Sequence, residues 1–226
     1  VSPAPIPRTN VANAALVSSI EIYNSVSDLF PINNPGRELV ICQRSITSDC
    51  ANWLEKLNPS DLPHFRLLVS PVDAREAITT ELDQCETTAN TPREWFISDI
   101  VDLVLIFSQI TKTELIDVRL DRIDGNACWK FHRDSVETRL LATYLGPGTE
   151  WLRPRYAEKA LQDQQNYTGP LEALSNNDIA IFKGSRSGIA NGIVHRSPPI
   201  EGTGGVRLLL CLNTQSIVSP EPWRSI

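Results

Sequence analysis

Between residues 114 and 214 the sequence divides into short apolar segments separated by turn-forming residues, and this pattern restricts the fold more than any other feature. The segment ELIDVRLDRID alternates apolar and charged residues in its middle, as a half-buried strand does. The strand-like segments that follow are WKFHRD, ETRLLATYL, DIAIFKG, GIVHRS and VRLLLCLN. Short strands at this spacing are typical of an antiparallel barrel or jelly roll, so we expect a β-sheet core here.

The first 114 residues are predicted to be mainly helical, with one or two strands packed with them. The strand candidates are 37–44 and 64–69, and the helix candidates are 48–57, 71–86 and a long apolar helix that begins at Thr91-Pro92 with Glu94 completing a capping box. The segment NVANAALVSSIEIYNSVSDLF fits a helix or broken helix, residues 1–10 fit an extended tail, and RPRYAEKALQDQQN fits a helical excursion. We expect one domain over 1–226, with a helical part before residue 115.

His132 and Asp134 lie at the end of one strand-like segment, WKFHRD. In a strand, residues i and i+2 point to the same face, so this imidazole and carboxylate can converge on one small object such as a metal ion. The third ligand is expected from His195, because it also ends a short β-branched segment and the chain has only three histidines. Two histidines and a carboxylate with open coordination positions form the facial triad of non-haem Fe(II) oxygenases. The remaining histidine, His64, is interpreted as structural or surface.

Arg207 opens the strand-like segment that follows His195. A guanidinium at this place is suited to gripping the far carboxylate of a dicarboxylic cosubstrate in a bidentate fashion. The alternative is an arginine paired with an acid at the rim of the sheet. Arg139 and Arg153 are reserve candidates for the same role.

These residues and their order resemble the double-stranded β-helix of 2-oxoglutarate/Fe(II)-dependent oxygenases, a jelly-roll or cupin-like fold. The likeness lies in H-x-D, then RLLATYL, NDIAIF, a histidine and a downstream arginine, and its nearest branch is that of the prolyl hydroxylases. It covers residues 115–215, and the GTGG insertion makes the interval from His195 to Arg207 slightly longer than usual. Through HRDSVETRLLATYLGPGTEWL the chain also resembles a bacterial family of proteins of unknown function.

The resemblance implies an α+β fold, with N-terminal helices packed on a double-stranded β-helix, and an oxygenase that uses Fe(II) and 2-oxoglutarate. It implies His132, Asp134 and His195 as catalytic metal ligands and Arg207 as the cosubstrate anchor, for an unidentified small-molecule, amino-acid or peptide substrate. Tyr144 matches a Tyr-Leu pair of the family pattern. Its hydroxyl either shares the cosubstrate carboxylate or is satisfied within the core.

Two other functions remain open for the same residues. The triad can hold zinc or another divalent ion in a hydrolase, an isomerase or a metal-homeostasis protein, since affinity alone favours zinc over iron. Alternatively the site is structural, in a non-catalytic binding module.

The net charge and the composition argue against several classes of binding partner. A net charge of −6 argues against non-specific binding to nucleic acid or an anionic membrane, which requires a basic face. No apolar run reaches membrane-spanning length. The five scattered cysteines include no CxxC pair, so we expect reduced thiols in a cytoplasmic protein.

Overall fold

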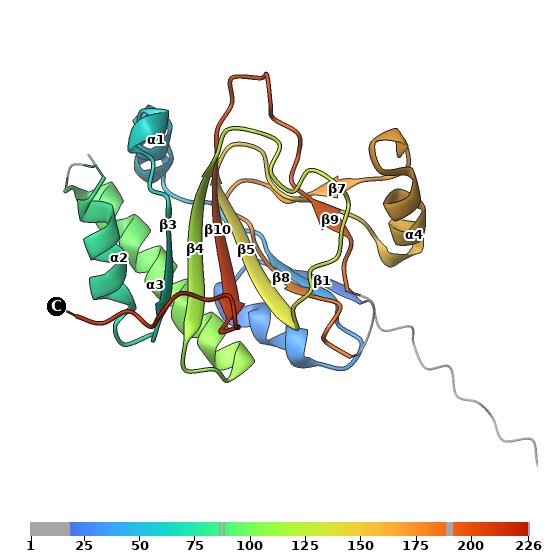
Figure 1. Ribbon diagram of the computed structural model, residues 1–226, viewed down its shortest axis with the longest axis horizontal. Helices are drawn as coiled ribbons and strands as arrows, with labels where there is room; N and C mark the ends of the chain where they lie inside the picture. The colour runs from blue at the N-terminus through green and yellow to red at the C-terminus, as the bar shows by residue number, and fades with distance from the viewer. Residues whose placement is uncertain (1–18, 86, 88, 189–191, 226) are drawn as a thin grey trace, which may run out of the picture.

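The computed structural model describes residues 19–85, 87, 89–188 and 192–225, and its centre is a seven-stranded sheet (Figure 1). The strands, in spatial order, are β1 (Ile20–Tyr23), β2 (Leu39–Cys42), β8 (Ile179–Lys183), β5 (Thr138–Leu145), β10 (Arg207–Thr214), β4 (Ile116–Ile123) and β3 (Phe65–Val69). Neighbouring strands are antiparallel, except β1 and β2, which are parallel. Apolar residues dominate these strands, which are buried along most of their length.

A smaller sheet packs against part of one face of this large sheet. It contains β7 (Glu172–Ala173), β6 (Glu150–Trp151) and β9 (His195–Arg196), and a bridge between His132 and His195 extends it by one more segment. Trp151 of the small sheet packs in one apolar cluster with Leu141, Phe182 and Leu209 of the large sheet. The site described below lies at the border of this cluster.

The chain passes back and forth between the two sheets in the order of a double-stranded β-helix. The successive segments are β4 (large sheet), the bridge at His132 (small), β5 (large), β6 and β7 (small), β8 (large), β9 (small) and β10 (large). The fold is therefore α+β with a jelly-roll core, as the sequence predicted.

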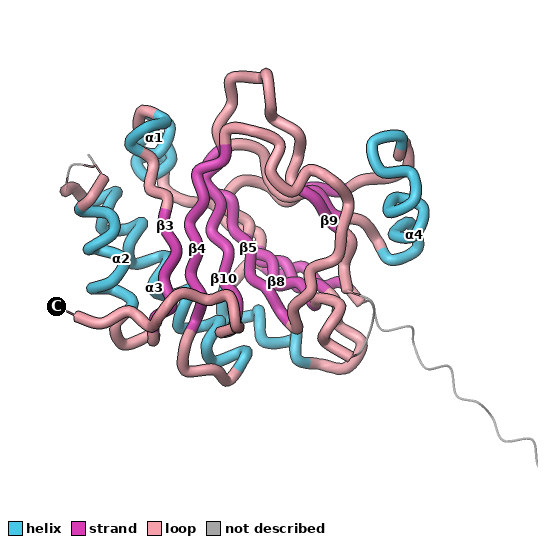
Figure 2. The backbone as a smooth tube through the Cα atoms, in the orientation of Figure 1, coloured by secondary structure: helices cyan, strands magenta, loops and turns pink. Residues whose placement is uncertain are grey.

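Helices cover the other face of the large sheet, where they enclose the larger apolar core (Figure 2). They are η1 (Val26–Asn33), α1 (Ser48–Lys56), η2 (Pro59–Asp61), α2 (Ala74–Asp83) and the long α3 (Thr91–Thr111), which packs on β4 and β10. The predicted cap of α3 is displaced by one residue: Asn90, not Thr91, accepts the hydrogen bond from the Arg93 amide, at 2.9 Å. The remaining helices, α4 (Pro154–Asp163) and η3 (Gln164–Asn166), lie beside the small sheet.

Two further sequence predictions about the elements need correction, and one falls on residues that the structure does not describe. The part before residue 115 supplies three strands rather than one or two, because residues 20–23 pair with β2 instead of forming a helix. The segment 129–134 forms only the single bridge at His132 rather than a strand. The extended tail predicted for residues 1–10 lies outside the described residues. No helix in the described part of the chain is long and apolar enough to cross a membrane.

Candidate metal centre

His132, Asp134 and His195 meet at the border between the two sheets. One potential ligand atom from each residue lies within 4.8 Å of the others. The backbone brings the two histidines together, because each donates its amide to the carbonyl of the other at 3.0 Å in an antiparallel bridge. Their rings are 4.6 Å apart between centroids, and Asp134 reaches both from two residues beyond His132. The structure thus places the three predicted ligands around one point.

Backbone carbonyls fix both imidazole rings. Nδ1 of His132 lies 2.8 Å from the Lys130 carbonyl, and Nδ1 of His195 lies 3.2 Å from the Ile193 carbonyl. Because a carbonyl oxygen can only accept, each neutral ring carries its proton on Nδ1 and keeps the lone pair on Nε2. Those Nε2 atoms face Asp134, at 3.7 Å from Oδ1 and 3.4 Å from Oδ2. Metal-binding histidines are oriented by hydrogen bonds of this kind.

The electrostatics of the site favour a bound cation. Asp134 is 6% exposed, and its Oδ2 is buried without a hydrogen-bond donor among the described residues. Burial lowers the pKa of His195 to about 4, against the opposing effect of the Asp134 charge, so this ring is neutral at pH 7. Each imidazole lone pair faces an oxygen of this buried carboxylate, which is unfavourable by itself, and a divalent cation between them removes the repulsion. The two nitrogens and one oxygen therefore fit a transition-metal ion such as Fe(II) or Zn(II).

Arg139 is the second partner of Asp134. From the start of β5, it donates from Nη1 to Asp134 Oδ1 and from Nε to the Asn213 side chain at 2.8 Å. This ion pair holds Oδ1 of the carboxylate and leaves Oδ2 without a donor, 3.4 Å from Nε2 of His195. The other reserve candidate, Arg153, instead pairs with Glu172 at the surface.

Arg207 is fully buried at the start of β10, and the described residues give it no ion-pair partner. Its Nε donates to the Pro147 carbonyl at 2.6 Å and its Nη1 to the Ser197 hydroxyl at 2.7 Å, while Nη2 lies 3.5 Å from the hydroxyls of Thr143 and Thr149. Burial lowers its pKa to about 10. Arg207 is therefore not an arginine paired with an acid at the rim of the sheet, which was the alternative interpretation of the sequence.

A Gly-Pro-Gly turn shapes the pocket around Arg207. Gly146 has φ +78° and lies so close to β10 that an added Cβ would meet the Val206 carbonyl at 2.4 Å. At Gly148 a Cβ would meet the Leu174 carbonyl at 1.9 Å. Only glycine fits these two approaches, which place the Pro147 carbonyl and the Thr149 hydroxyl beside the guanidinium.

Tyr144 faces the opposite side of the sheet, and its predicted contact with a cosubstrate is wrong. Its ring packs edge-on against Phe96 of α3, and its hydroxyl donates to Asp99 at 2.6 Å. Side chains alternate along a strand, so Thr143 points towards Arg207 while Tyr144 points into the helical core. Burial, with the nearby Asp99 charge, raises the pKa of Tyr144 well above its ordinary value. The alternative of a core aromatic with a satisfied hydroxyl is the one observed.

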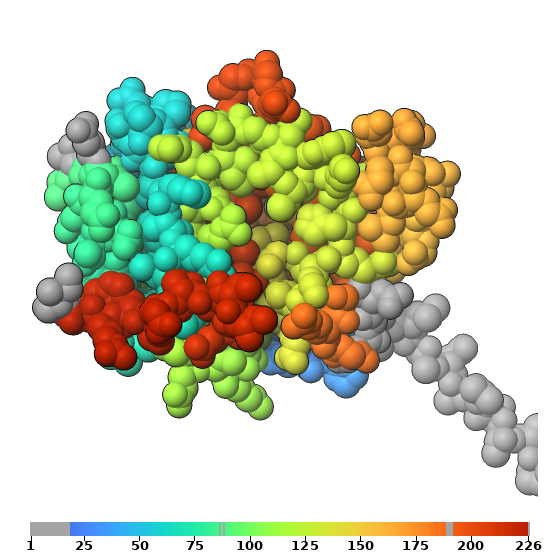
Figure 3. All heavy atoms as spheres, in the orientation of Figure 1, coloured from blue at the N-terminus to red at the C-terminus, as the bar shows by residue number. Residues whose placement is uncertain are grey.

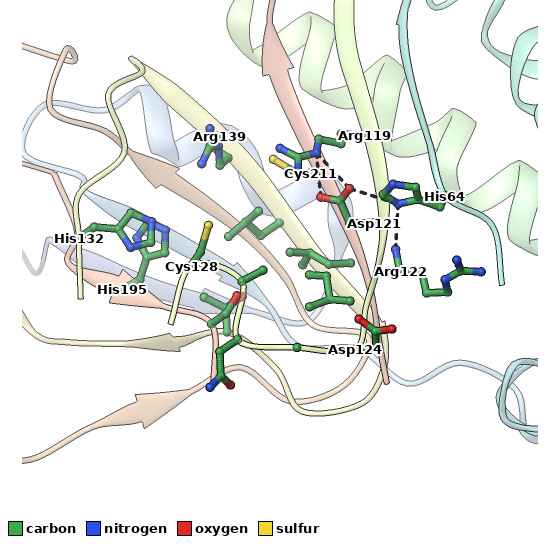
Figure 4. Close-up of a pocket in the computed structure, with 18 residues that line it drawn as sticks. His64, Arg119, Asp121, Arg122, Asp124, Cys128, His132, Arg139, His195 and Cys211 are labelled. Atoms are coloured by element: carbon green, nitrogen blue, oxygen red, sulfur yellow. Dashed lines mark hydrogen bonds and ion pairs between the residues drawn. The ribbon is translucent and has the colours of Figure 1, made fainter. Parts of the chain in front are cut away.

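A cavity of about 370 Å³ begins at the triad and runs across β5, β10 and β4. Figure 3 shows it as a hollow on one face of the molecule, bordered by the loop after β4 and by the C-terminal segment. His132 and His195 lie at one end, together with Thr149 and Ser197. Arg119, Asp121 and His64 lie towards the other (Figure 4).

Several of these cavity residues were not singled out from the sequence. His64, interpreted as structural or surface, lines the cavity because β3 pairs with β4 in the register Phe65 to Leu120. Arg119 and Asp121 occupy alternate positions of β4, so the alternation in ELIDVRLDRID already indicated a shared face. Ser197 follows His195 by two residues, so the same alternation along a strand indicated that their side chains share a face.

A family model described as DUF1826, protein of unknown function, matches residues 24–213. No curated protein sequence matches the chain. Among solved structures, the chain is similar to the 2-oxoglutarate complex of a dioxygenase for auxin oxidation from Arabidopsis thaliana, with 14% identity and a TM-score of 0.43 over 71% of this chain and 66% of that chain. It thus spans slightly less than two thirds of the plant protein.

A Pseudomonas putida prolyl-4-hydroxylase is similar at 10% identity and a TM-score of 0.41, over 84% of this chain and 98% of that chain. A full-length Neurospora crassa protein in complex with alpha-KG and 5-formyluracil is similar at 9% identity and a TM-score of 0.40, over 78% of this chain and 74% of that chain. At such distances, the function has to be argued from the residues of this chain.

Proposed function

We propose that this chain, which belongs to the DUF1826 family, is an Fe(II)- and 2-oxoglutarate-dependent oxygenase that hydroxylates a small-molecule or amino-acid substrate. The observation that carries the proposal is the buried, unsatisfied Asp134 Oδ2, which lies 3.4 Å from Nε2 of His195 on a carboxylate whose Oδ1 lies 3.7 Å from Nε2 of His132. His132, Asp134 and His195 would hold the metal on one face and leave its other positions towards the cavity.

Iron and 2-oxoglutarate, when bound, would supply the oxidation: R–H, O₂ and 2-oxoglutarate give R–OH, succinate and CO₂. The chain's own residues bind, orient and exclude water. The Lys130 and Ile193 carbonyls keep both rings in the ligating tautomer, and Arg139 keeps the Asp134 carboxylate turned towards them. The apolar walls Leu141 and Leu209 limit water beside the reacting centre.

Arg207 would anchor the far carboxylate of 2-oxoglutarate. In the part of the chain that the structure describes, the hydrogen bonds of this fully buried cation go to hydroxyls and one carbonyl. Its charge is poorly compensated, since the nearby Glu150 offsets the cost of burial only in part, and a bound carboxylate would supply the missing charge. Two of the hydroxyls, those of Thr149 and Ser197, also line the cavity that contains the histidines. A dicarboxylate would therefore have a metal-binding end and an arginine-binding end in one pocket.

The first test is anaerobic addition of Fe(II) and 2-oxoglutarate to metal-free protein. The proposal predicts one bound iron and a visible metal-to-ligand charge-transfer band that requires both additions. His132→Ala should remove the iron and the band. His64→Ala is the matched control, because His64 lies outside the triad, and it should retain both. A protein that binds iron but never develops the band would instead support the non-oxygenase metal protein, with zinc as the competing ion.

A cytoplasmic location belongs to the same proposal. It is supported by the five cysteines, all of which are free thiols in the structure.

A further inference from the structure

The end of the cavity away from the triad contains a small polar cluster formed by Arg119, Asp121 and His64 (Figure 4). Arg119 and Asp121 come from β4, and His64 precedes β3. The proposed metal and cosubstrate sites use none of the three. Their hydrogen-bonding capacity therefore indicates what the open part of the cavity is suited to hold.

Arg119 is oriented by Asp121 but not saturated by it. Its Nε lies 3.0 Å from Oδ1 and 2.8 Å from Oδ2 of Asp121, whose side chain is only 11% exposed. Among the described residues nothing accepts from the terminal Nη1 and Nη2 groups, and the Arg119 side chain is 52% exposed. The two terminal amino groups are thus free donors on a guanidinium whose direction is fixed, which is the arrangement that binds a carboxylate.

His64 adds a third donor. Its Nδ1 accepts the Arg122 amide at 3.4 Å, so the neutral ring carries its proton on Nε2, and 60% of the side chain is exposed. Nδ1 also lies 3.6 Å from Asp121 Oδ1, so the ring is held beside Arg119. This end of the cavity therefore offers donors to a ligand. Two carboxylates line the cavity: that of Asp121 is buried and paired with Arg119, and that of Asp124 is exposed.

The space between this cluster and the triad is apolar. Arg119, Cys211 and Leu141 are cross-strand neighbours in one row of β4, β10 and β5, and Leu209 lines the next row. Two strand spacings separate Arg119 from Leu141, or about 10 Å. The cavity therefore presents a charged end, an apolar middle of several carbon atoms and, beyond it, the candidate metal centre.

We infer that the substrate is a small carboxylic acid with an apolar chain. Its carboxylate would bind Arg119 and His64, its chain would lie over Cys211, Leu209 and Leu141, and the C–H bond at its far end would face the triad. This inference rests on the proposed function, because the C–H bond at the far end of the substrate is oxidised only if the triad holds the metal. Arg119 would be the specificity-determining residue, and Asp121 the residue that positions it.

The test uses three probes of equal chain length, hexanoate, 1-hexanol and hexylamine, with binding measured by ligand NMR on metal-free protein. Hexanoate is expected to bind at least about tenfold more tightly than the other two, and Arg119→Gln to remove that preference, as expected for loss of a charge-assisted hydrogen bond. Arg122→Gln is the matched control, since Arg122 also lines the cavity but its guanidinium is occupied by the Pro59 and Ser60 carbonyls. It should leave hexanoate affinity unchanged.

Orientation is then measured with Mn(II) bound in place of iron, using its paramagnetic relaxation of the hexanoate protons. The inference predicts stronger relaxation at the terminal methyl group than at the methylene next to the carboxylate. Equal hexanoate affinity in Arg119→Gln and the parent protein, tighter binding of hexylamine, or the reverse order of relaxation would overturn it while leaving the oxygenase proposal intact. Failure of the protein to bind Mn(II) would overturn the oxygenase proposal, and the substrate assignment with it.

Discussion

Replacing Arg207 by methionine separates a cosubstrate anchor from a structural arginine. Burial lowers the pKa of Arg207 to about 10, well below the ordinary value of an arginine, which corresponds to about 3 kcal/mol of destabilisation of the charged group in the folded state. At pH 7 the guanidinium is charged in both the folded and unfolded chains. The folded protein therefore bears this full cost, which is relieved only as the pH rises through about 10.

Methionine removes that cost and also removes the hydrogen bonds to the Pro147 carbonyl and the Ser197 hydroxyl. Each hydrogen bond to a charged group contributes about 1.5–3 kcal/mol. Because the two effects oppose each other, the free energy of unfolding of metal-free Arg207→Met should fall by no more than about 3 kcal/mol, whereas removing one partner of a buried ion pair costs about 3–5 kcal/mol.

In contrast to the small change in stability, the affinity for 2-oxoglutarate should fall strongly. Loss of a buried charged partner weakens binding by about 2–4 kcal/mol, so 2-oxoglutarate affinity should fall by about 30-fold to 1,000-fold. The assays are urea unfolding of the metal-free protein and anaerobic titration of the Fe(II) form with 2-oxoglutarate. Arg153→Met, which removes an exposed arginine paired with Glu172, is the matched control and should change neither quantity greatly. A variant that loses more than about 3 kcal/mol of stability yet binds 2-oxoglutarate normally would refute the reasoning.

Three further substitutions test other parts of the structure. Tyr144→Phe should lower the free energy of unfolding by about 1–3 kcal/mol, because it removes one hydrogen bond to the Asp99 carboxylate of α3, which keeps its ion pair with Arg44. It should not alter 2-oxoglutarate affinity, and weaker cosubstrate binding at unchanged stability would place Tyr144 in the site after all. Gly148→Ala forces a backbone clash in the turn beside Arg207, so both the melting temperature and the 2-oxoglutarate affinity should fall. A variant with normal values of both would show that the turn can accommodate a Cβ atom. His195→Ala should abolish Fe(II) binding, measured by metal analysis after desalting, and retained stoichiometric iron would remove His195 from the ligand set.

The local periodicity of the sequence predicted much of the fold. The strands β2, β3, β4, β5, β8 and β10 and the helices α1 to α4 lie close to their expected positions, because each carries its own apolar pattern or helix-start signal. Residues 20–23 do not carry one. They are a strand because they pair with β2, and such pairing depends on contacts between segments rather than on local preference.

The site, like the fold, was predicted only where local sequence patterns determine it. The i, i+2 spacing of His132 and Asp134 indicated a shared target, and the position of His195 at the end of another segment indicated the partner. The face of each β5 side chain was not predictable, because alternation says that Thr143 and Tyr144 point in opposite directions but not which of them faces the cavity. That choice is decided by the helices, which cover one side of the sheet.

The most direct test of the central claim is succinate formation after air is admitted to the protein loaded anaerobically with Fe(II) and 2-oxoglutarate. The account predicts release of succinate that requires iron and oxygen and that is lost in Asp134→Ala. Iron-loaded, folded protein that leaves 2-oxoglutarate unchanged in air, with or without a carboxylic acid such as hexanoate present, would contradict it.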